Sequence, residues 1–145
     1  MSIYLRKNLV FIPTTIETNG ASCMDIEPVS VIPVTDQGEL RRAIENFPIR
    51  GNLFMEHIPR MTGILLPTIA ASARVKSWSA FYRGVSAWSL YDIDGIYRLL
   101  RWRSGSGRGL NPDEDGKILF TRAMGFDAIC NSVVETVQAE AAKKS

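Results

Sequence analysis

The residues of this 145-residue chain that could carry out chemistry are few and widely spaced. His57 is the single histidine and follows Glu56 in a segment between Gly51 and Pro59, so a catalytic histidine is conceivable. A hydrolase of the serine type would also need a nucleophile in a motif such as G-x-S-x-G, which the sequence lacks. A surface histidine is therefore the preferred interpretation. An enzyme whose site combines Glu56, His57 and Arg83 is kept as an alternative.

No sequence motif indicates a bound cofactor or metal ion. Residues 105–109 read G-S-G-R-G, but they lack the G-x-x-x-x-G-K-[ST] spacing of a phosphate loop, and a strand rather than a helix is predicted to follow. The acidic run at 113–115 lacks the alternating ligands and the final glutamate of a calcium loop. Cys23 and Cys130 lie too far apart for a C-x-x-C site. We therefore expect no cofactor, no metal site and no catalytic residue.

Two groups of residues have the composition of a protein-binding surface. Asp113, Glu114 and Asp115 could contact the basic surface of a nucleic-acid-cutting partner, although a solvated turn is the simpler interpretation. Tyr82 and Arg83 belong to a cluster of aromatic and arginine side chains, the residue types that are enriched at interface hot spots. The alternatives for that cluster are core packing and the stacking of single-stranded bases. We take these five residues as the candidate partner-binding site.

The overall charge and hydropathy are typical of a soluble globular domain. The 17 basic and 15 acidic residues leave a net charge of +2, which is too balanced to favour direct nucleic-acid binding. No uninterrupted apolar run approaches the ~18 residues of a membrane span, and the N-terminal stretch MSIYLRKN lacks the apolar core of a signal peptide. We expect a cytoplasmic protein with one domain, residues 1–145, no membrane contact and unlinked cysteines.

The strongest structural signal is a hairpin within residues 76–103, the stretch that holds all three tryptophans. Asp94-Gly95 lies between two apolar runs and favours a type I′ turn, in which both central residues have positive φ. A two-residue loop sets the register, so Ile93 should face Ile96. Neither face of this hairpin is wholly polar. We therefore expect a central hairpin that other elements cover on both sides.

The N-terminal part of the chain is predicted to form paired strands. Residues 3–17 are rich in β-branched and aromatic types, and Asn19-Gly20 predicts a turn into a return strand over residues 22–34. The apolar alternation changes phase near Pro28, which predicts a bulge. Two acidic residues of the return strand could also meet a basic partner or, as exposed charges, protect a sheet edge: Asp25 and Glu27.

Helical segments are predicted in the middle of the chain. Asp36 is a favourable N-cap for a helix that should end at Pro48. Residues 49–67 contain several glycines and prolines and are expected to be irregular. Two short helical turns should follow, at residues 68–74 and 78–83.

The C-terminal part is predicted to contain a loop, a short strand and a long helix. The polar residues 104–117 are expected to form a flexible loop, and residues 118–121 a last short strand. A helix over residues 126–141 has one apolar face, and its tail should fray from about residue 140. The fold class is therefore α+β. We expect a mainly antiparallel sheet, a capped helix after the second strand, and a C-terminal amphipathic helix packed on the sheet.

The strings SWSAFYRGVSAW and GRGLNPDEDG, with the Asp-Gly hairpin between them, resemble a group of small bacterial proteins. These are the immunity proteins of contact-dependent growth inhibition systems, which accompany a secreted toxin and bind its C-terminal domain. The resemblance contains no catalytic motif and transfers no partner-binding residue. It implies a cytoplasmic immunity protein that binds a cognate toxin domain, often a nuclease, and occludes its active site. The alternative is a single-stranded nucleic-acid-binding module that uses the aromatic and arginine surface.

Overall fold

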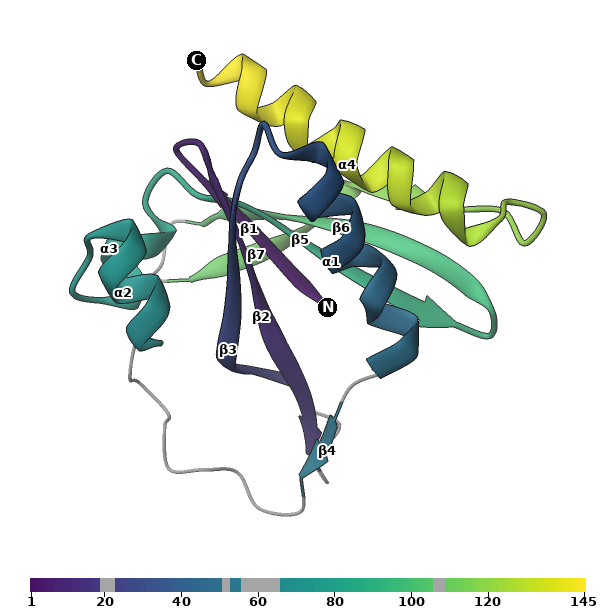
Figure 1. Ribbon diagram of the computed structural model, residues 1–145, viewed down its shortest axis with the longest axis horizontal. Coiled ribbons are helices and arrows are strands. Elements are labelled where there is room, and N and C mark those ends of the chain that lie inside the picture. The colour runs from purple at the N-terminus through teal and green to yellow at the C-terminus, as the bar shows by residue number, and fades with distance from the viewer. Residues whose placement is uncertain (19–22, 51–52, 56–65, 106–108) are drawn as a thin grey trace.

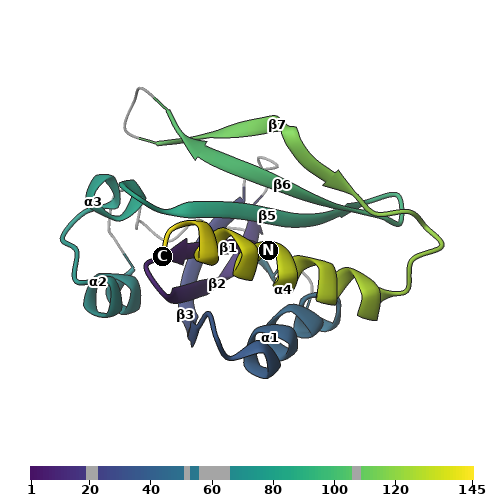
Figure 2. The same ribbon diagram turned by 90° about the horizontal axis from the view of Figure 1, so that it is seen from above.

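The computed structural model describes residues 1–18, 23–50, 53–55, 66–105 and 109–145, which fold around a twisted β-sheet (Figure 1). Figures 1 and 2 show α1 and α4 side by side across the sheet, with α2 and α3 as a separate pair at one end. The elements in chain order are β1 (Ser2–Arg6), β2 (Leu9–Thr18), β3 (Cys23–Pro33), α1 (Gln37–Arg50), β4 (Leu53–Met55), α2 (Pro67–Ala73), α3 (Trp78–Tyr82), β5 (Ser86–Ile93), β6 (Ile96–Ser104), β7 (Leu110–Leu119) and α4 (Phe126–Lys143).

Within these ranges the strands form one sheet in the order β3-β2-β1-β5-β6-β7, and every neighbouring pair in this order is antiparallel. The short β4 joins the sheet as a parallel partner of the end of β2. This arrangement confirms the α+β class with a mainly antiparallel sheet. Because β1 pairs with β5, the N-terminal strands and the central hairpin share one continuous set of backbone hydrogen bonds.

Successive side chains of a strand point to opposite faces of the sheet. Both faces carry buried apolar side chains, so the protein has a core on each side of the sheet. On β1, Ile3 and Leu5 belong to a core that α1 and α4 cover, whereas Tyr4 belongs to a second core beneath α2 and α3. The apolar stripe of α4 is buried in the first core: Ile129, Cys130, Val133, Val134 and Val137. The C-terminal amphipathic helix is therefore packed on the sheet, as predicted (Figure 2).

β5 and β6 form the predicted central hairpin. Ile93 pairs with Ile96, and Asp94-Gly95 has φ values of 54° and 74°, as a type I′ turn requires. Leu90 belongs to the first core and Ala87 to the second. The hairpin is therefore covered on both faces.

Replacing Gly95 with valine should lower the free energy of unfolding by about 1–2 kcal/mol, as measured by chemical denaturation. A β-branched residue is strained at the φ of 74° that Gly95 adopts. No atom lies within 4 Å of the place where a Cβ would stand, so the loss comes from backbone strain and not from a clash.

Gly38→Ala is the matched control, because Gly38 lies in the first turn of α1 and its new Cβ would meet its nearest neighbour at 3.8 Å. Alanine favours the helix, so this variant should be as stable as the wild type or more stable. A Gly95→Val protein with unchanged stability would contradict the turn assignment.

The N-terminal segment differs from the prediction, because residues 3–17 form two strands rather than one. The chain turns at Lys7 and Asn8, where Lys7 has a φ of 55°, and β1 then pairs with β2. The apolar pattern continues across this turn and so does not reveal it. The capped helix therefore follows the third strand. The Asn19-Gly20 turn lies outside the described residues, although β2 and β3 pair as predicted.

β3 contains the predicted bulge near Pro28. Pro13 of β2 pairs with Val29 while Thr14 pairs with Ile26, so residues 27–28 have no partner in the register. An irregularity of this kind bends the strand and increases its twist.

The predicted cap of α1 is confirmed, since the Asp36 carboxylate accepts a hydrogen bond from the Glu39 amide at 3.0 Å. The helix ends at Arg50 and not at Pro48. A proline in the last turn removes only one N–H donor, so the helix can continue for two more residues. The prediction that residues 49–67 are irregular is wrong at β4. Pairing with β2 makes residues 53–55 a strand. α2 and α3 agree with the two short helical turns.

β7 overturns the prediction of a flexible loop over residues 104–117. The chain forms an edge strand from Leu110 to Leu119 that pairs with β6, and the short strand predicted at residues 118–121 is the end of it. An edge strand tolerates many polar residues because one side of it faces solvent. Hydrogen bonds from β6, and not an apolar pattern of its own, therefore define this strand.

α4 continues to Lys143, so the frayed tail predicted from about residue 140 is also wrong. Glu140 and Ala141 are buried. The Glu140 carboxylate accepts hydrogen bonds from Ser86 at 2.8 Å and from Arg101 at 2.7 Å. These partners lie on the central hairpin, so the local sequence around Glu140 gives no sign of them.

Candidate functional site

The predicted acidic residues lie on the edge strand β7, and two of them are paired with basic side chains. Asp113 forms an ion pair with Arg103 of β6, and Glu114 pairs with Lys117 at 2.6 Å. Asp115 is exposed. The acidic run therefore carries less uncompensated charge than its composition indicates.

The register between β6 and β7 places this run in a large bulge. Arg101 pairs with Asp113, whereas Leu99 pairs with Ile118, so residues 114–117 lie opposite a single residue of β6. A charged bulge on an edge strand prevents another strand from adding to the sheet. The structure thus gives the acidic run an edge-protecting role, and its contact with a partner stays a prediction.

Tyr82 and Arg83, the other predicted residues, come from the end of α3. Tyr82 lines a pocket that Leu110, at the start of β7, also reaches. Arg83 is exposed and follows the helix as its C-cap. Within the described lining, the structure brings Tyr82 to the pocket but neither Arg83 nor the acidic run. Glu56 and His57 lie outside the described residues.

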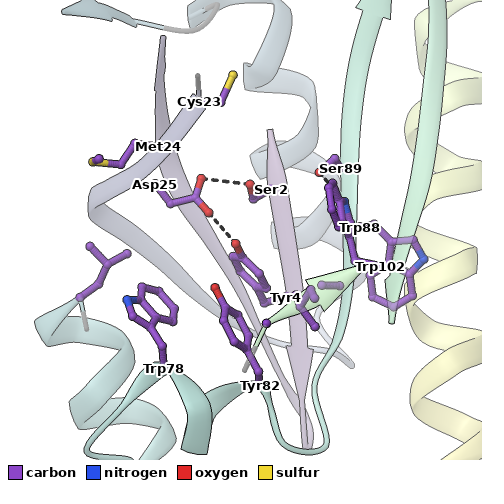
Figure 3. A pocket seen from close by; sticks show the side chains of 14 residues that line it. Ser2, Tyr4, Cys23, Met24, Asp25, Trp78, Tyr82, Trp88, Ser89 and Trp102 are labelled. Atoms are coloured by element: carbon purple, nitrogen blue, oxygen red, sulfur yellow. Dashed lines mark hydrogen bonds between the residues drawn. The ribbon is translucent and has the colours of Figure 1, made fainter. Parts of the chain in front are cut away.

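The pocket has a volume of about 550 Å³ and lies between β1, β3, α3 and the paired ends of β5, β6 and β7 (Figure 3). Cys23 and Gly109, which also line it, are exposed, so the pocket is open to solvent. Its polar and aromatic character comes from these side chains: Ser2, Tyr4, Asp25, Trp78, Tyr82, Trp88, Ser89 and Trp102. It is therefore an aromatic pocket with a carboxylate in its wall.

Aromatic side chains form two walls of this pocket. Trp78 and Tyr82, one helical turn apart on α3, are stacked with ring centroids 5.4 Å apart and an angle of 18° between their planes. Phe81 lies behind them and contacts both rings. From the sheet, Trp102 donates its indole N–H to Ser89 Oγ at 2.8 Å, which fixes the orientation of its ring. These rings are held by packing and hydrogen bonds before any ligand arrives.

Asp25 of β3 projects across the neighbouring strands into the pocket (Figure 3). Its carboxylate accepts hydrogen bonds from the hydroxyl groups of Ser2 at 3.0 Å, Tyr4 at 2.6 Å and Thr15 at 3.1 Å. These donors come from β1 and β2. The strand order β3-β2-β1 therefore holds the carboxylate in one position.

The pKa values of Tyr4, Tyr82 and Cys23, which line the pocket with Asp25, are raised, so each group favours its neutral form. The pKa of Tyr4 is raised well above 10 because burial disfavours the phenolate, and the charge and hydrogen bond of Asp25 add to this effect. Burial, followed by the charge of Asp25, also raises the pKa of Tyr82. Burial and the charge of Glu17 raise the pKa of the Cys23 thiol. The Tyr4 hydroxyl therefore stays protonated, and donates to Asp25, at pH values where an exposed tyrosine would ionise.

Stability should fall as the pH rises above about 10, and Tyr4→Phe should remove part of this fall. An unfolded tyrosine loses its proton near this pH, whereas folded Tyr4 keeps its proton. The folded state then binds more protons than the unfolded state, so a further rise in pH favours unfolding. Urea denaturation at about pH 8 and about pH 11 measures the difference. A folded Tyr4→Phe protein that shows the same fall as the wild type would contradict the assignment.

Sequence patterns raised Asp25 and Glu27 together, either as contacts for a basic partner or as charges that protect a sheet edge, and they did not include Asp25 in the candidate site. In the structure Asp25 lines the pocket, while Glu27 accepts hydrogen bonds from the amides of Val29 at 3.1 Å and Thr68 at 2.8 Å. Neither residue acts as a simple edge charge. One sequence signal could have distinguished Asp25. It is a charged residue directly between two apolar residues of a predicted strand, Met24 and Ile26.

Among the described residues, no group of three or more His, Cys, Asp or Glu side chains is arranged to hold a metal ion, and no helix is both long and apolar enough to cross a bilayer. Cys23 and Cys130 are free thiols, the first exposed and the second buried.

No protein-family model matches this chain, and no curated protein matches it significantly. Its fold is similar to that of a solved structure from Neisseria meningitidis, described as a protein of unknown function, with a TM-score of 0.66 and 8% sequence identity. The similarity covers 96% of this chain and 92% of that chain. At this level of identity the match shows a shared fold, and it supports the α+β assignment alone.

Proposed function

We propose that this protein is an immunity protein that binds a cognate toxin domain, a nuclease, and neutralises it by occluding its active site. The observation that carries the proposal is the open pocket, which Trp78, Tyr82 and Trp102 line together with the Asp25 carboxylate. Tryptophan and tyrosine are the residue types that contribute most to binding at protein interfaces. The resemblance to the immunity proteins of contact-dependent growth inhibition systems supplies the class of partner.

The arrangement of the pocket favours binding over turnover. The hydroxyl groups around Asp25 donate to the carboxylate and so orient it. The described lining contains no histidine. A protein that acts by occlusion needs a rigid surface with preformed contacts, which lowers the entropy lost on binding.

A single-stranded nucleic-acid-binding module is the second candidate, and the stacked rings of Trp78 and Tyr82 favour it, because such rings can stack on bases. The charges oppose it. The described lining has no basic side chain, and Asp25 would repel a phosphate backbone. Titration with an oligothymidylate at low and high salt separates the two functions. Salt-sensitive binding would favour the second candidate, since phosphate contacts release counterions.

Co-expression of this protein with its cognate toxin domain should protect cells from that domain. Replacement of Trp78 and Tyr82 by serine should weaken toxin binding by at least about 30-fold, because truncated hot-spot residues typically cost about 2 kcal/mol or more. The double variant His57→Ala, Glu56→Gln should protect fully, because occlusion of the toxin does not require these residues to catalyse a reaction. Survival in co-expression and calorimetry with the purified partner measure the two quantities.

The acidic bulge is tested separately with Glu114→Lys and Asp115→Lys, which spare the ion pair between Asp113 and Arg103. Weaker binding at low salt is expected if a basic nuclease surface docks on β7, because like charges slow association. A folded His57 and Glu56 double variant that no longer protects would contradict occlusion. Unchanged toxin affinity in the Trp78 and Tyr82 variant would remove the pocket from the interface.

A further inference from the structure

We propose that the pocket binds the guanidinium group of an arginine side chain that the toxin domain presents, an inference that rests on the proposed function for the identity of the partner. The guanidinium lies against the stacked rings of Trp78 and Tyr82 and donates a hydrogen bond to Asp25. The pocket thereby recognises one basic anchor residue of the partner.

Charge is the first reason for a cationic ligand. Asp25 is the single charged side chain in the described lining, and no lysine or arginine of the described residues forms an ion pair with it. Burial lowers the pKa of the Met1 amino group, and the charge of Asp25 partly offsets this effect. The ammonium group donates its hydrogen bond to the Leu90 carbonyl at 2.9 Å and not to Asp25. A half-buried carboxylate in this position attracts a cation from the ligand.

Hydrogen-bonding capacity is the second reason and favours arginine over lysine. A carboxylate offers about four lone-pair positions, and three hydroxyl donors already occupy the Asp25 oxygens. About one acceptor position therefore remains. A lysine ammonium has three N–H donors and is strongly hydrated, so it loses more solvation than this site returns. A guanidinium is weakly hydrated and can satisfy one donor here while its other edges face solvent.

The shape of the pocket is the third reason. The guanidinium is planar and stacks on aromatic faces, where the ring quadrupole attracts its positive charge. Trp78 and Tyr82 present a preformed aromatic wall on α3, and Figure 3 shows both side chains extending from the helix toward Asp25. The volume of about 550 Å³ leaves room for the whole arginine side chain and some water. Planar cations with an apolar stem therefore fit both the wall and the carboxylate.

The test is a titration of the full-length protein with N-acetyl-L-argininamide, followed by the indole N–H signals of Trp78 and Trp102 in NMR spectra. We expect saturable binding with a Kd of about 1–10 mM, the range of a single-residue ligand. N-acetyl-L-citrullinamide, which has nearly the same shape without the charge, should bind at least about tenfold more weakly, and the lysine analogue should also bind more weakly.

Asp25→Asn should weaken binding of the arginine probe by at least about tenfold. Asp115→Asn removes the same charge from an exposed site and should change the Kd by less than about twofold. Thermal denaturation confirms that each variant is folded. If Asp25→Asn does not fold, the comparison of the arginine and citrulline probes on the wild-type protein still decides the matter.

Equal affinity for the two probes, tighter binding of the lysine analogue, or unchanged affinity in a folded Asp25→Asn protein would each overturn the inference. The co-expression experiment tests the proposed function independently, because probe binding requires no toxin. A protein that protects cells but does not bind the arginine probe would overturn this inference and leave the proposed function standing. Selective probe binding without any toxin binding would support the guanidinium site and contradict the proposed function.

Discussion

Replacement of Phe81 by alanine should lower the free energy of unfolding by about 3–5 kcal/mol. Phe81 is 0% exposed, and its ring contacts surrounding rings edge-on or tilted, with centroid separations of 5.5 to 5.9 Å: Tyr4, Phe11, Trp78 and Tyr82. Removing the ring loses both the transfer free energy and these aromatic contacts, and it leaves a cavity between α3 and the sheet. Such a loss is a large part of the total stability of a domain, which is typically about 5–15 kcal/mol.

Urea denaturation of Phe81→Ala and Phe81→Leu measures this effect and supplies its control. Leucine fills most of the cavity, so it should cost roughly 1–2 kcal/mol. The alanine variant should also weaken binding at the pocket, because Trp78 and Tyr82 rest on Phe81. A loss below about 1 kcal/mol for Phe81→Ala would show that the second core is not packed as described.

Glu140→Ala should cost about 2–4 kcal/mol, the next largest effect, because it breaks a mostly buried ion pair. The Glu140 side chain is 9% exposed and its Arg101 partner is 29% exposed. Arg101 Nε is already buried without a hydrogen-bond partner, so loss of Glu140 leaves the guanidinium further unsatisfied. Ser86 would lose its acceptor as well.

The control for this variant is Glu135→Ala, an exposed glutamate on the same helix, which should change stability by less than about 0.5 kcal/mol. Glu140→Gln keeps an acceptor for Ser86 and should lose less stability than Glu140→Ala. Equal stability of Glu135→Ala and Glu140→Ala in urea would show that α4 frays before residue 140, as the sequence pattern predicted.

The sequence by itself determined those elements whose signals act over a few residues. Asp94-Gly95 specified the central hairpin and its register, because the turn type follows from the φ values that these two residues accept. Asp36 specified the start of α1 through a hydrogen bond to an amide three residues later. The apolar stripe of α4 was recognisable from its helical period alone.

Only the tertiary structure decided the elements that depend on a neighbouring strand. The polar residues of β7 form a strand because β6 supplies their backbone partners, and the turn at Lys7 and Asn8 is set by the pairing of β1 with β2. The end of α4 is ordered because Glu140 meets Ser86 and Arg101. The bonds of Glu140 join residues 54 and 39 positions apart, whereas β1–β2 and β6–β7 are pairs of consecutive strands, the first without a clear turn signal and the second without a clear apolar pattern in β7.

The candidate site combines both kinds of information. The sequence indicated an aromatic binding surface that includes Tyr82, because residue types alone identify side chains suited to interfaces. It could not place Asp25 in the same pocket as Tyr82 and Trp102, since those residues come from β3, α3 and β6. The order β3-β2-β1-β5-β6 brings these strands together, and no local pattern specifies the long-range pairing of β1 with β5 that joins the N-terminal strands to the central hairpin.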